Sequence, residues 1–299
     1  MTPKVSVVMC TYNTKQYIAE AIESVLAQTF RDFEFIIWDD GSTDGTKAIV
    51  DSYKDERIRY FYHENTGLGM ALKLACAEAK GKYIARMDSD DVSLPERFAK
   101  EVEFLEQHKD YVLVSSAVYN IDEHGTVLGR SFPCPDDRVL KGLLAKASNM
   151  ISHPMSMMRR DAYEKAGGYI PIRKSQDTLF WSRLAKHGKF YNISQPLGKY
   201  RLLETSLDHV VNPYSQIIKS FLRKMILDKD VLDSDVDEYN KLYHYSKQFI
   251  LKEKRGPVLY KKSPEEVVYN VISIVLGFRF AERMIIGFKI CFYRYKLNN

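Results

Sequence analysis

The strongest constraint on the fold is a regular alternation of apolar runs and amphipathic segments along the first ninety residues. Short runs rich in β-branched and aromatic residues predict strands at residues 5–9, 33–38, 58–62 and 83–87. Apolar residues at helical spacing between these runs predict helices at residues 18–26, 47–53 and 70–79. Such alternation is typical of a mainly parallel sheet covered by helices, so the sequence predicts an α/β fold.

The rest of the chain carries weaker but consistent patterns. Further elements are predicted as a helix at 95–107, a strand at 112–119, a turn at 122–125 and a helix at 178–187. Beyond about residue 212 the pattern is wholly helical, and the sequence contains no internal repeat. Ligands of a parallel sheet bind beyond the carboxyl ends of its strands, so the polar loops there are the first place to look for a site.

Cysteine usage and charge narrow the class of protein. The four cysteines form no CxxC pair and no zinc-type spacing with histidine, which indicates free thiols in a reducing, cytoplasmic setting. No signal peptide is recognised at the N-terminus. The net charge of +5 is uneven, with −3 over residues 1–100 and +5 over residues 201–299. The positive charge of residues 201–299 favours binding to an anionic surface, with phospholipid preferred over nucleic acid. The alternative is that this charge serves only the solubility of the protein.

A cluster of acids follows the fourth predicted strand. Asp88, Asp90 and Asp91 fall within four residues, directly after the run at 83–87. Three carboxylates so close together repel one another and need a positive partner. A hard divalent cation is such a partner, because it prefers oxygen ligands, and a diphosphate would complete its coordination. Helix capping is the alternative, but it would use Asp91 alone.

Several ordered motifs resemble one enzyme family. The opening VSVVMCTYNTKQYIAEAIESVLAQTFRDFEFIIWDDGSTDGT, the later YIARMDSDD, and then SHPMSMMRRDAYEKAGGY, SQDTLFWSRL and YRLLETSL are similar to family 2 glycosyltransferases over residues 3–208. The resemblance implies the GT-A fold of nucleotide-diphospho-sugar transferases with a C-terminal helical extension. It divides the chain into a catalytic domain at 1–211 and a helical region at 212–299. Within the domain, residues 1–110 would bind the nucleotide and residues 111–211 the acceptor.

The family implies roles for the residues that end the first two strands. Cys10, Thr11 and Tyr12 match positions that hold the nucleotide base. Asp40 matches the acid that accepts a hydrogen bond from the uracil ring N–H, and a carboxylate is suited to this because it only accepts. The alternative for Asp40 is a turn-forming residue before Gly41.

The family's DxD motif corresponds to Asp88 and Asp90. Asp90 would ligate Mn²⁺ or Mg²⁺ directly, and Asp88 would contact ribose or metal-bound water, with Ser89 also in the nucleotide-sugar site. His153 resembles a histidine that lies near the diphosphate, although a structural histidine is the alternative. Arg201 is expected to contact phosphate.

Asp177 matches the catalytic base of the family. It stands at the start of an amphipathic helix, where a helix N-cap is the alternative role. Most relatives carry Glu-Asp at this point, whereas this chain has Gln176 before the Asp. The resemblance thus implies an inverting displacement in which Asp177 takes the proton of the acceptor hydroxyl.

The implied substrates are a nucleotide sugar, with UDP-sugars favoured, and a saccharide or lipid-linked acceptor in cell-surface polysaccharide or glycolipid synthesis. A dinucleotide oxidoreductase is disfavoured, because Gly67-Leu68-Gly69 follows the third strand and lacks the third glycine. The remaining alternative is a degenerate transferase fold that serves as a membrane-surface or assembly partner. Intact Asp40, Asp88, Asp90 and Asp177 argue against it.

The C-terminal segment from residue 267 to 299 has its own pattern. Its longest nearly apolar run, 267–278, is too short to span a bilayer, and the segment carries five Lys or Arg against one Glu. This combination predicts a helix lying in a membrane interface, which would place the protein at the inner face of the plasma membrane. Packing on the catalytic domain or in a homodimer is the alternative.

Overall fold

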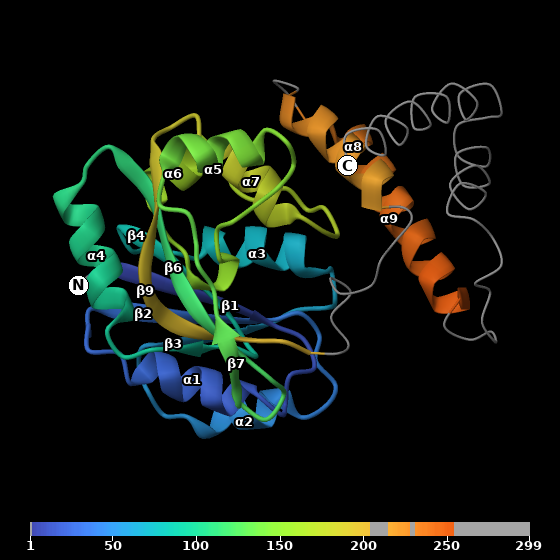
Figure 1. The fold of residues 1–299 in the computed structure, drawn as a ribbon. Helices are drawn as coiled ribbons and strands as arrows, with labels where there is room; N and C mark the ends of the chain where they lie inside the picture. The colour runs from blue at the N-terminus through green and yellow to red at the C-terminus, as the bar shows by residue number, and fades with distance from the viewer. Residues whose placement is uncertain (1, 204–214, 228–230, 254–299) are drawn as a thin grey trace, which may run out of the picture. The chain divides into compact units, whose positions relative to one another are not determined.

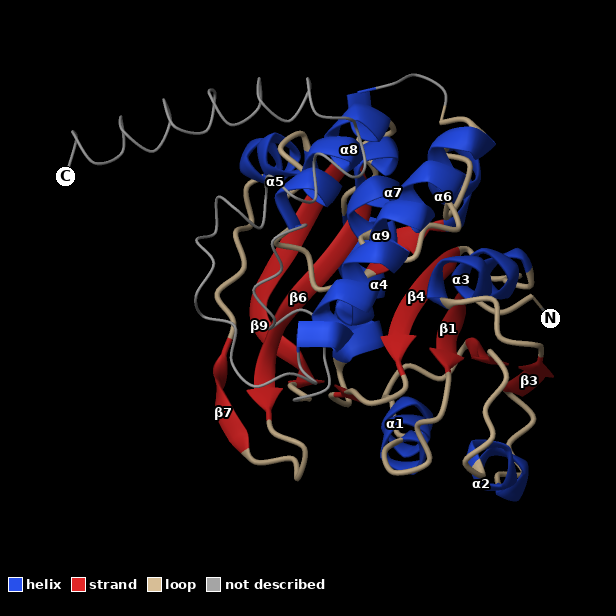
Figure 2. Cartoon of the chain, turned by 90° about the vertical axis from the view of Figure 1, so that its right-hand side faces the viewer, coloured by secondary structure: helices blue, strands red, loops and turns tan. Residues whose placement is uncertain are grey.

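The computed structural model describes residues 2–203, 215–227 and 231–253. Among them, nine strands form a single sheet (Figures 1 and 2). The strands follow the spatial order β3 (Ile58–Tyr62), β2 (Phe33–Asp39), β1 (Val5–Thr11), β4 (Tyr83–Asp88), β8 (Met157–Arg159), β6 (Tyr111–Ile121), β9 (Lys189–Arg201) and β5 (Val92–Ser93), with β7 (Val127–Arg130) paired to β6.

The sheet is parallel in its first part and mixed in its second. Strands β3, β2, β1 and β4 are all parallel neighbours, as the alternating sequence predicts. Antiparallel pairing enters with β8, which joins β4 to β6, while β6 and β9 are parallel. The parallel part brings the carboxyl ends of β1, β2 and β4 to one edge, and Figure 2 shows those of β1 and β4.

Helices cover both faces of the sheet (Figure 1). One face packs against α3 (Leu68–Ala77), α5 (Asp137–Leu144), α6 (Arg160–Lys165) and α7 (Gln176–Leu184). The opposite face packs against α1 (Ile18–Leu26), α2 (Thr46–Ser52) and α4 (Arg97–Gln107).

Strict alternation along the strands explains the two cores. In β1, Val7 and Met9 enter the core with α1, whereas Val8 and Cys10 enter the core with α3. In β4, Ile84 belongs to the α3 side, so Arg86 and Asp88, at the same parity, project to that side too. Because residues on both faces of β1 and β4 are buried, these strands consist mainly of apolar residues.

The secondary structure predicted for residues 1–121 is confirmed, with bounds differing by a few residues. The turn at 122–125 is confirmed as the connection between β6 and β7, with Gly125 at φ 88°. The sequence indicated neither α5 nor the long strand β9. The side chain of Asp136 caps α5 by accepting from the backbone N–H groups of Arg138 and Val139.

Two helices follow the sheet, α8 (Ser215–Leu227) and α9 (Asp233–Glu253), in keeping with the helical pattern of the sequence. The described chain falls into two compact units: the first holds the sheet, its helices and residues 222–236, and the second holds the other described parts of α8 and α9. The boundary predicted near residue 211 and the segment 267–299 lie outside the described residues. No helix in the described part is long and apolar enough to cross a membrane.

Candidate functional site

Three loops at the carboxyl edge of the parallel strands are joined by hydrogen bonds. The loop after β1 binds the loop after β2, because the Asn13 backbone N–H donates to Ser42 Oγ at 2.9 Å and the Thr43 N–H donates to Asn13 Oδ1 at 2.8 Å. Asn13 takes a left-handed conformation, φ 53°, to make both contacts. Asp44 accepts from the Lys15 N–H, and from the Thr46 N–H and hydroxyl at the start of α2. These contacts form a rigid rim around the edge.

Asp40 joins this rim to the loop after β3. Its Oδ1 accepts from both the backbone N–H and the hydroxyl of Thr66, each at 2.9 Å, and its Oδ2 accepts from the Gly67 N–H at 2.8 Å. The carboxylate is buried and offers about four lone-pair sites, of which three are in use. The remaining site, on Oδ2, can accept one further N–H donor. The structure thus gives Asp40 a loop-holding role that is compatible with the predicted contact to a base.

The other residues predicted around the base differ in exposure. Tyr12 is 51% exposed at the open rim, whereas Thr11 is buried and its hydroxyl bonds that of Thr14 at 2.6 Å. Cys10 is buried in the α3-side core, and burial raises the pKa of its thiol. Of the three side chains, that of Tyr12 is the one open to a ligand.

The acids after β4 lie in a tight turn next to a buried guanidinium. Arg86, only 1% exposed, pairs with Asp88 through Nη2. Within the described residues, the Nε and Nη1 groups of Arg86 have no hydrogen-bond partner, and neither has Asp91 Oδ2. Unsatisfied buried polar groups are rare and costly, so this cluster is a place where the chain tolerates strain.

The residues present fit a divalent cation. Burial and the charge of Asp88 raise the pKa of Asp90 to about 6, which shows that local cations do not fully compensate the acids. Among the described residues, no three His, Cys, Asp or Glu side chains enclose a metal by themselves. Two carboxylates, Asp88 and Asp90, are the kind of partial set that a cation completes with substrate phosphates and water.

Arg201 has other partners than the predicted phosphate. Its Nε donates to the Asp90 carbonyl at 2.8 Å, and its Nη2 pairs with Glu20 at 2.6 Å. Its Nη1 donates to the carbonyls of Asp122 and Glu123. With four of its five N–H groups in use and its side chain 2% exposed, Arg201 holds the acidic turn in place and has little capacity left for a phosphate.

His153 lies on the α3 side of the sheet, in a short 3₁₀ turn (His153–Met155). Its Nε2 shares a hydrogen bond of 2.8 Å with the Tyr169 hydroxyl, and its ring packs edge-on against Trp181. Burial and the positive charge of Arg86 lower the pKa of His153 well below its usual range. The ring is therefore neutral near pH 7. Proximity to a diphosphate remains a prediction for this residue.

Asp177 is the second residue of α7, so it is not the helix N-cap. That position is held by Ser175, in a left-handed conformation with φ 58°. Asp177 Oδ2 accepts from Asn149 Nδ2 at 2.9 Å, and the Thr178 hydroxyl lies 3.4 Å from Oδ1. Burial raises the pKa of Asp177 above its ordinary value. A carboxylate in this setting is a stronger proton acceptor than one in water.

Two residues of the site were missed by the sequence reasoning. For Arg86 the sequence did contain a signal, since it is the one charged residue in the apolar run of residues 83–87 and stands two positions before Asp88. Asn149 had none, because it lies 28 positions before Asp177 in a stretch without clear periodicity.

Comparison with known proteins gives the family. The model of "Glycosyl transferase family 2" matches residues 6–167. The chain is 37% identical over 207 residues to "Putative glycosyltransferase EpsE" of Bacillus subtilis, covering 67% of this chain and 73% of the relative. It is 34% identical over 211 residues to "Putative teichuronic acid biosynthesis glycosyltransferase TuaG" of the same organism, covering 69% and 81%.

Solved structures share the fold. Residues 1–349 of S. aureus TarS, in complex with UDP-GlcNAc, match with a TM-score of 0.64 at 20% identity, over 91% of this chain and 81% of that one. The mannosyltransferase PcManGT of Pyrobaculum calidifontis, in complex with GDP-Man and Mn²⁺, matches with a TM-score of 0.54 at 16% identity, over 94% and 83%. Such similarity bears out the predicted GT-A fold. From its motifs, its fold and these relatives, the chain belongs to glycosyl transferase family 2.

Proposed function

We propose that this family 2 glycosyltransferase moves a sugar from a nucleotide diphosphate, with UDP-sugars as the preferred donors, to an acceptor hydroxyl with inversion. The observation that carries the proposal is the placement of Asp40, Asp88 and Asp90 along one edge of the parallel strands. The complexes of TarS with UDP-GlcNAc and of PcManGT with GDP-Man support a nucleotide-sugar donor by analogy of fold.

The donor would lie across the carboxyl ends of β1, β2 and β4. Asp40 can accept the uracil N–H on Oδ2, and Tyr12 offers an exposed ring beside the rim. Asp88 and Asp90 would hold Mn²⁺ or Mg²⁺, with Ser89 buried in the turn between them. When bound, the cation would neutralise negative charge on the departing diphosphate.

The acceptor half would supply the base. The acceptor oxygen forms a bond to the anomeric carbon while the bond from that carbon to the diphosphate oxygen breaks, and the diphosphate leaves with the electron pair. The hydroxyl proton passes to the carboxylate of Asp177, which Asn149 orients. Attack from the face opposite the leaving group inverts the anomeric configuration.

The context we propose is synthesis of a cell-surface polysaccharide or glycolipid, with a hexose or N-acetylhexosamine as the sugar. Support comes from the name of TuaG, which places that relative in teichuronic acid synthesis. The acceptor would then be a saccharide or a lipid-linked saccharide at the cytoplasmic face of the plasma membrane. Membrane contact through residues 267–299, which are outside the described residues, is part of this proposal.

A donor screen tests the function. Nucleotide release would be measured with UDP-, dTDP- and GDP-sugars, each with Mn²⁺, with Mg²⁺ and with EDTA. We expect release from at least one UDP-sugar, dependent on a divalent cation and on Asp177. Absence of turnover with every donor, together with absence of UDP binding, would instead favour a degenerate transferase fold that acts as an assembly partner.

A further inference from the structure

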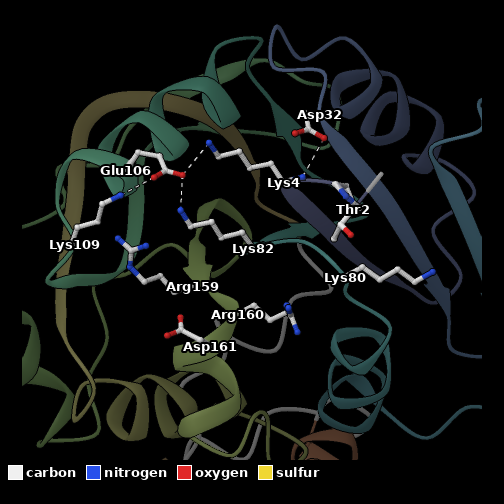
Figure 3. A pocket seen from close by; sticks show the side chains of 11 residues that line it. Thr2, Lys4, Asp32, Lys80, Lys82, Glu106, Lys109, Arg159, Arg160 and Asp161 are labelled. Carbon is white, nitrogen blue, oxygen red and sulfur yellow. Dashed lines mark hydrogen bonds and ion pairs between the residues drawn. The ribbon is translucent and has the colours of Figure 1, made fainter.

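A basic hollow lies at the edge of the sheet opposite the proposed donor site (Figure 3). It has a volume of about 750 Å³ and is formed where β1 and β4 begin, beside the end of α4 and the start of α6. Since β1 runs from this edge to the other and a strand rises about 3.3 Å per residue, the two sites are on the order of 20 Å apart. The hollow is therefore separate from the donor site.

The hollow carries an excess of positive charge. Six Lys or Arg side chains line it against three carboxylates. Three of the ammonium groups share a single acid: Lys4, Lys82 and Lys109 approach Glu106 at 3.0, 2.8 and 2.8 Å (Figure 3). One carboxylate cannot neutralise three ammonium groups, which repel one another at this separation. Their hydrogen bonds lower the pKa of Glu106, so it stays ionised.

Two further basic residues of the hollow, Arg159 and Lys80, differ in whether their side chains already have hydrogen-bond or ion-pair partners. Arg159 is engaged, because it donates to the carbonyls of Leu105, His108 and Tyr111 around the end of α4. Lys80 is open: it is exposed, and within the described residues its ammonium group makes no ion pair. Figure 3 shows the side chain of Lys80 directed away from Glu106, so the charge available to a ligand at this point comes from Lys4, Lys82 and Lys109.

We propose that this hollow binds a phosphorylated ligand through its terminal phosphate group. Ammonium groups arranged around a point suit the tetrahedral phosphate, whose oxygens accept from several donors at once. A single carboxylate in the ligand would add little to what Glu106 already supplies. The ligand could come from solution, as a free diphosphate, or from a lipid headgroup, and the chemistry that recognises it is the same.

Titration calorimetry with pyrophosphate tests the proposal on the full chain. EDTA would be present throughout, so that metal-assisted binding at Asp88 and Asp90 does not contribute. We expect the double variant Lys82→Gln/Lys109→Gln to bind pyrophosphate roughly a hundredfold more weakly, because two charge-assisted contacts are lost. Glu106→Gln should bind on the order of tenfold more tightly, because the competing carboxylate is removed.

The chain offers a matched control. Lys47 pairs with Asp51, and Lys54 donates to the Asp51 carbonyl, on the surface of α2. Lys47→Gln/Lys54→Gln thus removes the same charge from another lysine pair around an acid, and it should leave pyrophosphate affinity unchanged. Equal weakening in both double variants would mean that only net charge matters, and would overturn the site.

Vesicle flotation distinguishes the two sources of the ligand. Phosphatidylcholine vesicles with phosphatidic acid would be compared with phosphatidylcholine vesicles with phosphatidylserine, which is anionic but has no terminal phosphate, for wild type, Lys82→Gln/Lys109→Gln and the α2 control. Loss of phosphatidic-acid-dependent flotation in the first double variant alone assigns the hollow to a lipid headgroup. Pyrophosphate binding that depends on Lys82 and Lys109, with flotation unaffected, assigns it to a soluble ligand. If wild type binds neither pyrophosphate nor phosphatidic-acid vesicles, the proposal fails.

Discussion

Asp177 is the residue whose chemistry the proposed reaction depends on most. Asp177→Asn preserves its shape and its contact with Asn149 but removes the proton acceptor. We expect turnover to fall by a factor of roughly a hundred or more, while donor affinity changes little. Steady-state kinetics with the donor from the screen would measure both. Turnover close to wild type would leave Asp177 as a residue that merely begins α7.

Asn149 is expected to tune that base. Its Nδ2–H stabilises the ionised carboxylate of Asp177, whose pKa burial already raises. A base works only when deprotonated, so kcat should fall on the acid side at a pKa above the ordinary carboxyl value of about 4. Asn149→Ala should move this acid limb to still higher pH. An acid limb that stays in place would show that Asn149 does not act through Asp177.

At the scale of single residues, the sequence indicated the acids but not their surroundings. Asp40, Asp88, Asp90 and Asp177 stand in local motifs, so they can be recognised along the chain. The partners of Arg201 cannot, because its contacts to Glu20 and Asp90 span 181 and 111 positions and exist only in the folded chain. The sequence therefore suggested a phosphate contact for Arg201, whereas the structure shows that most of its N–H groups bond protein atoms.

At the scale of the strand, two buried arginines at β4 differ in how fully their N–H groups are hydrogen-bonded. Arg86, on β4, has two buried N–H groups without partners, while Arg97, which packs against the same strand, bonds Glu101, Ser93 and the Arg86 carbonyl. We expect Arg86→Met to weaken UDP–Mn²⁺ binding roughly tenfold, because Asp88 loses the group that orients it. Its melting temperature without nucleotide should change little, since two unsatisfied donors are removed along with the ion pair.

Arg97→Met is the matched control for this prediction. It would leave Glu101 buried and unpaired, which costs about 3–5 kcal/mol of folding free energy. Calorimetry of both variants, with and without UDP–Mn²⁺, separates the two roles. A large loss of stability in Arg86→Met with unchanged nucleotide affinity would make Arg86 a structural residue only.

Strand β9, which the sequence reasoning missed, depends on a distant neighbour. The four parallel strands were predicted because each is a short run rich in apolar and aromatic residues, and β1, β2 and β4 are almost wholly buried. Strand β9 contains Pro196 and Gly198, which local propensity treats as breakers. The structure accommodates them where the pairing of β6 and β9 shifts register, near Ala117 and Val118. Such tolerance depends on a neighbour about eighty residues away, which no local pattern reveals.

At the scale of the whole molecule, the sheet has two edges with opposite charge. The carboxyl edge gathers acids for a cation and a nucleotide, whereas the amino edge carries the basic hollow around Glu106. The basic segment 267–299 lies outside the described residues, and its proposed membrane contact is tested by removing it. The truncated chain should lose binding to phosphatidylserine vesicles, which offer no terminal phosphate to the basic hollow, but keep binding UDP–Mn²⁺, because the motifs end near residue 208. Loss of nucleotide binding would make the segment part of the catalytic core.

The melting temperature in the presence of UDP and Mn²⁺ tests the central claim most directly. At a ligand concentration about 100 times the dissociation constant, binding adds about 2.7 kcal/mol, which raises the melting temperature of a chain of this size by roughly 4–5 °C. We expect this rise in wild type, its loss in EDTA and its loss in Asp90→Ala. If Asp90→Ala is stabilised by UDP–Mn²⁺ as much as wild type, the acids after β4 do not hold the nucleotide through a cation, and the account is contradicted.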